Sequence, residues 1–405
     1  MKNLLNILFF LLLVTQICFA QWYPQNSGTT EALYGVLFID ANNGTAIGGA
    51  GIILTTTDGG TSWTTQTSGT TFSLHSVSFT DVNIGTAVGS NGTILRTTNG
   101  GTTWTSQSSG TTQSLESVSF TDANNGTAVG DAGTILRTTN GGTTWTAQVS
   151  GTSFSLYGVS FTDANNGTAV GSGGTILRTT NGGTNWISQS SGTTYNLWDV
   201  SFTDANNGTV VGSVSILRTT NGGTDWISQT NGTQDVLWGV SFTDANNGSA
   251  VGMDGVILRT INGGTDWTSQ SSGTTIYLFS VSFADANNGA AVGEGGTILR
   301  TTNGGSTFVE EELLNEIPTE FLLTQNYPNP FNPSTKIRYS VPQSSNVIIK
   351  VFDILGNEKE TLINEEKQAG TYNITWTAAE LPSGIYFYTI NAGNFNETKK
   401  MILLK

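Results

Sequence analysis

The sequence has few charged residues and almost no histidine or cysteine, two residue types that often build catalytic or metal centres. Charged residues make up 11% of the 405-residue chain, against about 25% in an ordinary soluble domain. There is one histidine, His75, and one cysteine, Cys18. The sequence has no Ser-His-Asp pattern, no His or Cys cluster with metal-ligand spacing and no phosphate-binding glycine loop. We therefore expect no cofactor, no metal centre and no enzymatic activity.

Long apolar runs are also missing, apart from Leu4–Val14, which follows a lysine near the start. This run is too short to span a bilayer. With the small residue Ala20 after it, the segment is typical of a secretory signal peptide over residues 1–20. Lipidation at Cys18 is an alternative that the bulky Ile17 disfavours. Cleavage after Ala20 removes the only cysteine, so the mature chain forms no internal disulfide and has no transmembrane segment.

Basic residues are too few to balance the acidic ones, and the formal net charge is −14. An acidic surface repels phosphate backbones, so we expect no nucleic-acid partner.

A tryptophan recurs through most of the chain at intervals of 41 residues, with one interval of 40. The series is Trp22, Trp63, Trp104, Trp145, Trp186, Trp226 and Trp267, with Phe308 in the eighth place. A period of about 40–45 residues with four strand-sized segments is the signature of a β-propeller. The seven periods predict an all-β, seven-bladed propeller over residues 21–308.

One repeat shows how a blade is built. The third repeat contains four predicted strands, at residues 115–120, 126–130, 134–139 and 145–148. Short links join them, and the Asn-Gly and Gly-Gly pairs supply the positive φ angles of tight hairpins. A lone blade buries too little apolar surface, so neighbouring blades must stack, and we expect the tryptophan to pack between them.

Ring closure can be predicted from the two ends of the repeat region. The chain starts with an orphan fourth strand at Trp22–Gln25, and the last repeat stops at Phe308 before a full fourth strand. We expect the N-terminal strand to complete the seventh blade beside Thr297–Thr302. Pro24 fits this outer edge, where a missing N–H is tolerated.

The hairpin between the third and fourth strands resembles the Asp-box of sialidase-type propellers. It carries Thr56, Asp58, Gly60 and Trp63 in the first repeat, and asparagine at the aspartate position later. Both side chains can bond to their own turn, which makes this a hairpin device. The whole repeat over Gln21–Phe308 resembles the Ycf48-type photosystem II assembly factors and their bacterial relatives. That resemblance implies protein binding, without implying photosynthesis.

Two further residue types repeat at fixed positions. Six blades carry an arginine where the first has Thr55: Arg96, Arg137, Arg178, Arg218, Arg259 and Arg300. Identical placement favours a structural ladder, with a neighbouring carboxylate as a possible partner, over a ligand site. Every blade also has an Asp-x-Asn-x-Gly turn, starting at Asp40, Asp81, Asp122, Asp163, Asp204, Asp244 and Asp285. These turns resemble the start of calcium loops but lack the distant glutamate, so turn chemistry is favoured and calcium remains the alternative.

The composition changes after Phe308. Residues 309–320 form an acidic linker, and alternating strands follow in residues 321–405 at 336–341, 347–353, 372–376, 384–390 and 400–404. Five to seven short strands in a segment of this size predict a small Ig-like β-sandwich.

The C-terminal segment closely resembles the type A sorting domain of the type IX secretion system. The resemblance rests on Tyr327, Pro328, Asn329, Pro330 and Phe331, on the segments that contain Gly356 and Gly384, and on the terminal Lys400–Lys405. It implies the type IX secretion machinery as a partner and a secreted or extracellular protein, released or attached to the outer-membrane surface. An unrelated Ig-like domain, such as the flagellar hook-cap module, is the alternative.

Comparison of the repeats with one another locates a candidate binding face. The turns between strands one and two, and between three and four, barely vary and share one face of the disc. Variation gathers on the other face, in the links between strands two and three and in the residue after the leucine that begins each blade. Those residues are Tyr34, His75, Glu116, Tyr157, Trp198, Trp238 and Phe279. Aromatic side chains with scattered acids suit a peptide or a sugar, although they could also fill space between blades.

Three functions are compatible with this pattern. The first is a non-catalytic module outside the cell that binds a protein or glycan. The second is a glycan-active hydrolase that uses Glu116, Asp131 or Glu294 as paired carboxylates. The third is a purely structural surface protein, which the near-uniform blades favour.

Overall fold

The computed structural model describes residues 22–305, 318–326 and 329–404. The chain divides into two compact units, Met1–Thr307 and Phe308–Lys405, and each is described by itself. The predicted signal peptide and most of the predicted acidic linker lie outside the described residues. No helix in the described ranges is long and apolar enough to cross a membrane.

The described part of the first unit contains seven four-stranded antiparallel sheets, which are the blades. Blade 1 comprises β2 (Leu33–Phe38), β3 (Gly44–Gly48), β4 (Ile53–Thr56) and β5 (Thr64–Gln66). Blade 2 comprises β6 (Leu74–Phe79), β7 (Gly85–Gly89), β8 (Thr93–Thr97) and β9 (Thr105–Gln107). Blade 3 comprises β10 (Leu115–Phe120), β11 (Gly126–Gly130), β12 (Ile135–Thr138) and β13 (Thr146–Ala147). Blade 4 comprises β14 (Leu156–Phe161), β15 (Gly167–Gly171), β16 (Ile176–Thr179) and β17 (Ile187–Gln189).

The remaining blades repeat this order. Blade 5 comprises β18 (Leu197–Phe202), β19 (Gly208–Gly212), β20 (Ile216–Thr219) and β21 (Ile227–Gln229). Blade 6 comprises β22 (Leu237–Phe242), β23 (Gly248–Gly252), β24 (Ile257–Thr260) and β25 (Thr268–Gln270). Blade 7 comprises β26 (Leu278–Phe283), β27 (Gly289–Gly293), β28 (Ile298–Thr301) and β1 (Tyr23–Gln25). Short 3-10 turns link strands two and three: η1 (Gly49–Gly51), η2 (Ser90–Gly92), η3 (Asp131–Gly133), η4 (Ser172–Gly174), η5 (Met253–Gly255) and η6 (Glu294–Gly296).

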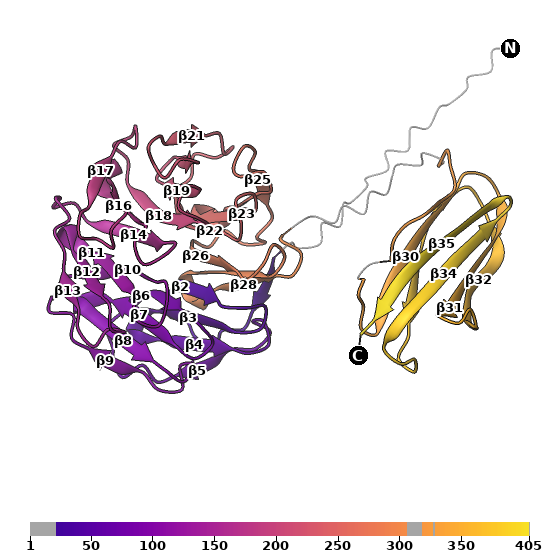
Figure 1. Cartoon of the computed structure of the whole chain (residues 1–405), viewed down its shortest axis with the longest axis horizontal. Coiled ribbons are helices and arrows are strands. Elements are labelled where there is room, and N and C mark those ends of the chain that lie inside the picture. The colour runs from indigo at the N-terminus through magenta and orange to yellow at the C-terminus, as the bar shows by residue number, and fades with distance from the viewer. Residues whose placement is uncertain (1–21, 306–317, 327–328, 405) are drawn as a thin grey trace, which may run out of the picture. The chain divides into compact units, whose positions relative to one another are not determined.

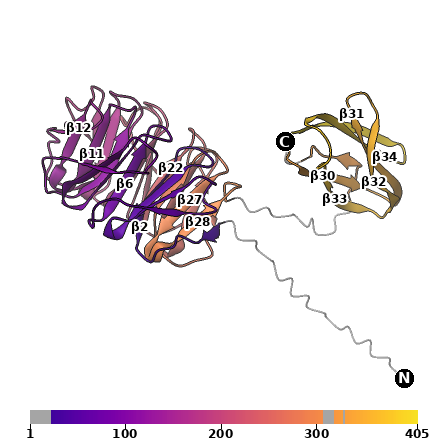
Figure 2. The same cartoon turned by 90° about the horizontal axis from the view of Figure 1, so that it is seen from below.

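The blades are arranged as a ring with their first strands innermost (Figure 1). Each first strand lies against the first strand of the next blade, and β2 of blade 1 lies against β26 of blade 7. Serine hydroxyls join these inner strands: Ser78 Oγ, for example, accepts a 3.0 Å hydrogen bond from the Phe120 backbone N–H of the next blade. Seen from the side in Figure 2, the strands of each blade run through the thickness of this unit.

The N-terminal strand completes blade 7, as predicted. β1 pairs antiparallel with β28, with Tyr23 opposite Arg300 and Gln25 opposite Ile298. Trp22 is fully buried, its ring centroid lies 5.7 Å from that of Phe283, and its Nε1 donates a 2.9 Å hydrogen bond to Gln270 Oε1 of blade 6. The first and last segments of the repeat region are therefore held together at one seam.

Apolar clusters lie between neighbouring blades. In one cluster, Val88 and Ile94 of blade 2 pack with Leu115 and Phe120 of blade 3. The partly buried Trp145 packs against this cluster. Trp145 stands edge-on to Phe120 of its own blade and donates a 3.2 Å hydrogen bond from Nε1 to Gln107 Oε1 of the preceding blade. The tryptophans thus seal each cluster, while branched aliphatic residues fill its centre.

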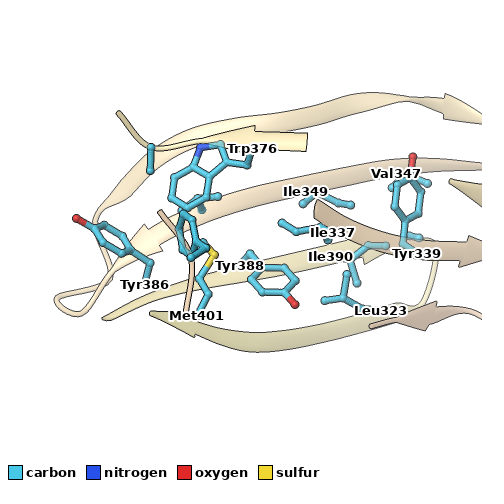
Figure 3. Close-up of a cluster of buried hydrophobic side chains, with 14 of the residues drawn as sticks. Leu323, Ile337, Tyr339, Val347, Ile349, Trp376, Tyr386, Tyr388, Ile390 and Met401 are labelled. Atoms are coloured by element: carbon cyan, nitrogen blue, oxygen red, sulfur yellow. The ribbon is translucent and has the colours of Figure 1, made fainter. Parts of the chain in front are cut away.

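The second unit consists of two antiparallel sheets, as expected for a sandwich. One contains β29 (Leu322–Leu323), β30 (Ser334–Val341) and β33 (Gly370–Thr377). The other contains β31 (Ser345–Asp353), β32 (Glu358–Lys367), β34 (Gly384–Ala392) and β35 (Phe395–Leu403). Trp376, Tyr388, Met401 and their neighbours form one core between them (Figure 3). Neither β29 nor β32 was predicted from the sequence.

Candidate functional site

The seven candidate residues all occupy the same structural position, a β-bulge in the innermost strand. In blade 3, Leu115 pairs with Gly130 and Ser117 with Val129, so Glu116 between them has no partner across the ladder. The same shift occurs in the other six blades. A bulge redirects a side chain away from the regular alternation of the strand. We call Tyr34, His75, Glu116, Tyr157, Trp198, Trp238 and Phe279 the bulge ring.

Side chains of the bulge ring contact one another across the blades. Tyr34 lies between His75 and Phe279, with ring centroids 5.7 and 5.6 Å away. Phe279 in turn lies 5.3 Å from Trp238. On the other arc, Tyr157 stacks on Trp198 at 4.6 Å. All seven residues are half-buried, so the structure brings the predicted residues together while leaving part of each accessible.

The polar members of the ring form a pair. His75 Nδ1 lies 2.9 Å from Glu116 Oε2, and Ser114 and Ser90 lie at the two ring nitrogens of His75. Burial acts to raise the pKa of Glu116, but hydrogen bonds from His75 and Ser114 and the attraction of His75 outweigh it, and the pKa is lowered. Glu116 is therefore held as a carboxylate that His75 already engages.

Asp199 directly follows Trp198 and was not predicted. The other blades carry serine or glycine here. Its Oδ1 accepts a 2.8 Å hydrogen bond from the Val200 N–H and its Oδ2 a 2.9 Å bond from Val240 N–H of the next blade. Burial of the carboxyl group raises its pKa to about 7, although hydrogen bonds to both backbone groups oppose this and the residue keeps some exposed surface. The sequence signal for Asp199 is that an aspartate stands where every other blade has serine or glycine.

A second set of variable residues lies before the bulge ring and was also missed. It occupies the loop position two residues before the leucine of each blade. Its large apolar members are all exposed: Phe72 (46%), Phe154 (54%), Tyr195 (56%) and Ile276 (40%). Their variation among otherwise similar repeats is the sequence signal that marks them.

The face of the bulge ring also contains the links between strands two and three. In blade 3, Asp131 N–H donates a 3.0 Å hydrogen bond to the carbonyl of Ser114, which lies just before β10. Asp131 Oδ1 accepts a 2.9 Å bond from Ser155 of the next blade. Glu294 lies in η6 and is exposed. We call this side of the disc, with the bulge ring and these links, the bulge face.

The opposite side, which we call the turn face, contains the Asp-x-Asn-x-Gly and Asn-Gly-Gly turns. Gly141 N–H of one turn donates to the carbonyl of Asn124 in the other, 3.0 Å away. Asp122 Oδ1 accepts from the N–H groups of Asn124 and Asn125, and Asn125 donates its side-chain amide to Asp122 Oδ2. The hydrogen bond from the Asn125 side chain is the largest cause that lowers the pKa of Asp122.

These turn carboxylates are therefore engaged by their own turns. The described residues contain no group of three or more His, Cys, Asp or Glu side chains arranged to hold a metal ion. The third-to-fourth hairpins show the same local use of polar groups: Gly142 N–H and Asn140 N–H both donate to Thr138 Oγ1, at 2.8 and 3.3 Å.

The repeated arginines do not pair with carboxylates. In the described chain no arginine lies within ion-pair distance of an aspartate or glutamate. Arg137 instead donates to Thr127 Oγ1 of its own blade (3.0 Å) and to the carbonyl of Ala164 in the next blade (2.9 Å), and its guanidinium lies 5.3 Å from the centroid of Phe161. These contacts agree with a structural ladder. The possible carboxylate partner forms no ion pair, because Asp122 accepts hydrogen bonds within its own turn, although its charge still acts on Arg137.

The sorting motif packs against the C-terminal strand. Phe331 N–H donates to the carbonyl of Ile402 and Leu404 N–H donates to that of Phe331, both at 2.9 Å. Asn329 Oδ1 accepts a 2.8 Å bond from the Ile402 N–H, and the Phe331 ring lies 5.6 Å from that of Trp376. The predicted motif residues Asn329, Pro330 and Phe331 thus lie beside β35.

The other motif residues have separate places. Gly356 adopts a φ of +81° in the turn between β31 and β32, and Gly384 begins β34 opposite Leu403. Tyr327, Pro328 and Lys405 lie outside the described residues.

Comparisons with known proteins agree with this architecture. The family model described as photosynthesis system II assembly factor YCF48 matches residues 14–156, 105–190, 148–229 and 225–329. A model of the secretion system C-terminal sorting domain matches residues 325–404. No curated protein matches the chain significantly.

Several solved structures are similar to the chain. "YCF48 bound to D1 peptide" is 21% identical, with a TM-score of 0.61 over 70% of this chain and 96% of that one. YCF48 from Cyanidioschyzon merolae is 22% identical, with a TM-score of 0.59 over 69% of this chain and 98% of that one. The GH74 enzyme of Niastella koreensis is 13% identical, with a TM-score of 0.57 over 93% of this chain and 74% of that one.

These identities establish a shared fold only. The sorting domain implies secretion by the type IX machinery. The family match extends over most of the chain, from the first blade to the last. The chain belongs to the YCF48 family of photosystem II assembly factor-like β-propellers and carries a secretion-system C-terminal sorting domain.

Proposed function

We propose that the protein is a non-catalytic binding module that acts outside the cell and engages a protein segment through its bulge face. The observation that carries this proposal is the bulge in all seven blades, which places the most variable residues of the repeat side by side. Their aromatic rings remain half-exposed, and partly exposed aromatic side chains with a few polar neighbours are typical of binding hot spots.

The outer residues of the same face support this proposal. Phe72, Phe154, Tyr195 and Ile276 expose apolar surface around the bulge ring. Apolar surface rimmed by polar threonine and serine loops is characteristic of interaction sites. The similar structure of YCF48 is that of a complex with the D1 peptide, which favours a peptide over a glycan as the ligand. The sorting domain indicates secretion, which supports a module that acts outside the cell, released or attached to the outer-membrane surface.

A hydrolase would use the same face differently. Its candidate carboxylates are Glu116, which His75 engages, Asp131, which accepts from Ser155, and the exposed Glu294. A glycosidase needs one protonated acid and one carboxylate about 5–10 Å apart, but the pKa of Glu116 is lowered rather than raised. This arrangement favours binding over catalysis.

The test is a capture experiment with the full mature chain against extracellular proteins of the producing cells and against a glycan array. Trp198→Ala and Trp238→Ala should each weaken capture by at least tenfold, because each removes a large hot-spot side chain. The matched control is Ile187→Ser, which changes an exposed residue (67%) on the outermost strand β17.

Four results would contradict the proposal. Capture that survives both tryptophan changes would move the site off the bulge face. Binding to the glycan array alone would replace the peptide with a sugar. Glycan hydrolysis that Glu116→Gln abolishes would establish the enzyme, and the absence of any ligand would favour a structural role.

A further inference from the structure

One seam between blades differs from the others on the turn face. Blade 1 carries Thr55 at the position that is arginine in the other six blades. Five of those arginines are at most 9% exposed: Arg96, Arg137, Arg178, Arg218 and Arg259. Each reaches across a seam to the following blade, so the seam between blades 1 and 2 lacks the cation that its counterparts contain.

The blade 3–4 seam shows what such an arginine needs. Arg137 uses the Thr127 hydroxyl, the Ala164 carbonyl, the amide oxygen of Asn125 at 3.3 Å and the face of Phe161. Burial lowers the pKa of the guanidinium, and the nearby carboxylate of the Asp-x-Asn-x-Gly turn partly opposes this. The site is a slot for a guanidinium group, with neutral acceptors and an aromatic wall.

The blade 1–2 seam keeps the groups that would receive this cation. Thr45 pairs with Thr55 in the register in which Thr127 pairs with Arg137. The Val82 carbonyl lies 3.0 Å from the Cβ position of Gly100, as the Ala164 carbonyl does for Gly182. The Arg137 Nη2 atom lies 3.8 Å from the Cβ position of Gly182. At Gly100, apart from its chain neighbours, no atom other than the Val82 carbonyl oxygen lies within 4 Å of the Cβ position. The acceptor is therefore in place and its intramolecular donor is missing.

A cavity of about 260 Å³ lies at this seam. Its lining includes Thr45, Thr55, Asn43, Phe79, Val82 and Leu37. Thr45, Asn43, Phe79 and Val82 correspond to the four groups that Arg137 contacts. We call this the Thr55 cavity.

The walls of the Thr55 cavity are more apolar than the corresponding positions of other blades. Leu37 and Ile39 line it, where blade 2 has Ser78 and Thr80. These side chains suit an alkyl stem, while the hydroxyl, carbonyl and amide oxygens suit a planar cationic head. A phenyl ring face adds cation–π attraction of about 0.5–2 kcal/mol when the cation is desolvated.

The glutamine latch of this seam is also rearranged. At four other seams a glutamine ties the blades together; Gln107, for example, donates to the Gly141 carbonyl and accepts from Trp145 Nε1. In blade 1, Gln66 donates instead to Thr55 Oγ1 at 2.9 Å, and Trp104 Nε1 is buried without a hydrogen-bond partner. The seams at Trp63 and Trp267 also lack the glutamine tie, but only the blade 1–2 seam lacks the arginine as well.

We propose that the Thr55 cavity binds an alkylguanidinium group, the chemistry of an arginine side chain presented by a ligand. The ligand's guanidinium takes the place that an intramolecular arginine fills at the other seams, with its stem against Leu37 and Ile39. The acidic net charge of −14 favours the approach of such a cation. This site lies on the turn face and is independent of the peptide site proposed on the bulge face.

The test is calorimetric titration of the mature full-length chain with N-butylguanidinium, with N-butylurea as the neutral isosteric control. One equivalent of butylguanidinium should bind, and butylurea should bind at least tenfold more weakly. Thr55→Arg should abolish the site by filling it from within. Phe79→Leu keeps the cavity but removes the ring face, and should weaken butylguanidinium binding severalfold. This second variant tests the proposal even if Thr55→Arg does not fold.

A matched control is available at another seam. Arg137→Thr should create a second cavity of the same kind, raise the stoichiometry to two equivalents and make the melting temperature rise with butylguanidinium more than in the parent chain. A peptide with a single arginine should compete, and its lysine counterpart should compete less because it lacks the planar fork. Any of three results would overturn the proposal. Butylurea could bind as tightly as butylguanidinium, Thr55→Arg could leave binding unchanged, or Arg137→Thr could leave the stoichiometry unchanged.

Discussion

The two faces of the propeller are built from the same repeat but use their polar and aromatic groups in opposite ways. On the turn face, Asp122 is engaged by its own turn and Arg137 by two blades, so these groups are satisfied within the fold. On the bulge face, Tyr157 and Trp198 contact each other and remain half-exposed. Positions that repeat without change therefore hold the ring together, and positions that vary are free for recognition.

The largest expected effect comes from breaking the closure that both faces depend on. Trp22→Ala removes a fully buried indole and its hydrogen bond to Gln270, and should lower the free energy of unfolding by about 3–5 kcal/mol. Trp145→Ala is the matched control, because its indole is only half-buried and its loss should cost less. Urea denaturation of both variants measures the difference, and equal losses would show that closure adds nothing special.

A change on the turn face should affect stability and leave ligand capture intact. Arg178→Ala leaves the Thr168 hydroxyl and the Ala205 carbonyl without their donor and uncovers the ring of Phe202. The expected loss is about 2–4 kcal/mol of unfolding free energy. Urea denaturation and the capture assay together test this. Loss of capture in a folded Arg178→Ala protein would contradict the division between the faces.

The reverse pattern is expected on the bulge face. Trp198→Ala removes a half-buried ring that stacks on Tyr157 and donates to Ser213. It should cost about 1–2 kcal/mol in stability while weakening capture at least tenfold. Denaturation and capture measured on the same preparation would test this, and a stability loss as large as that of Arg178→Ala would favour a space-filling role for the ring.

The last expected effect is a pH dependence at Asp199. An aspartate has a pKa of about 3.9 in an unfolded chain, and burial raises that of Asp199 to about 7 in the fold. Because the folded state then binds the proton more tightly, stability falls as pH rises between these values. Asp199→Asn does not titrate, so its stability relative to the parent should increase from about pH 4 to about pH 7. Denaturation across this range measures it, and parallel profiles would contradict the assignment.

Much of the propeller could be predicted because each strand carries its own local signal. Leu115–Phe120 and Gly126–Gly130 were predicted to the residue. The two outer strands of that blade are shorter than predicted, at Ile135–Thr138 and Thr146–Ala147, because pairing ends before the alternating pattern does.

The misses have equally local causes. β32 was missed because Glu358–Lys367 is an edge strand with mostly exposed, charged residues, so it lacks the apolar alternation that marks a half-buried strand. The bulges were missed because a shift in register is a property of two paired strands, and the sequence of one strand does not show where its partner's register changes. Variation among the repeats still located the residues that occupy them.

By itself, the sequence determined the number of blades, their four-stranded form, the strand that closes the ring and the C-terminal sorting domain, because period, turn residues and alternation are properties of the chain order. The tertiary structure decided which groups meet across the seams. It alone showed that the arginines bond to carbonyl and hydroxyl oxygens, that Asp199 accepts hydrogen bonds from two neighbouring inner strands, and that Thr55 leaves a cavity. The reason is physical: such contacts join residues from different blades, and their geometry exists only after the blades have packed.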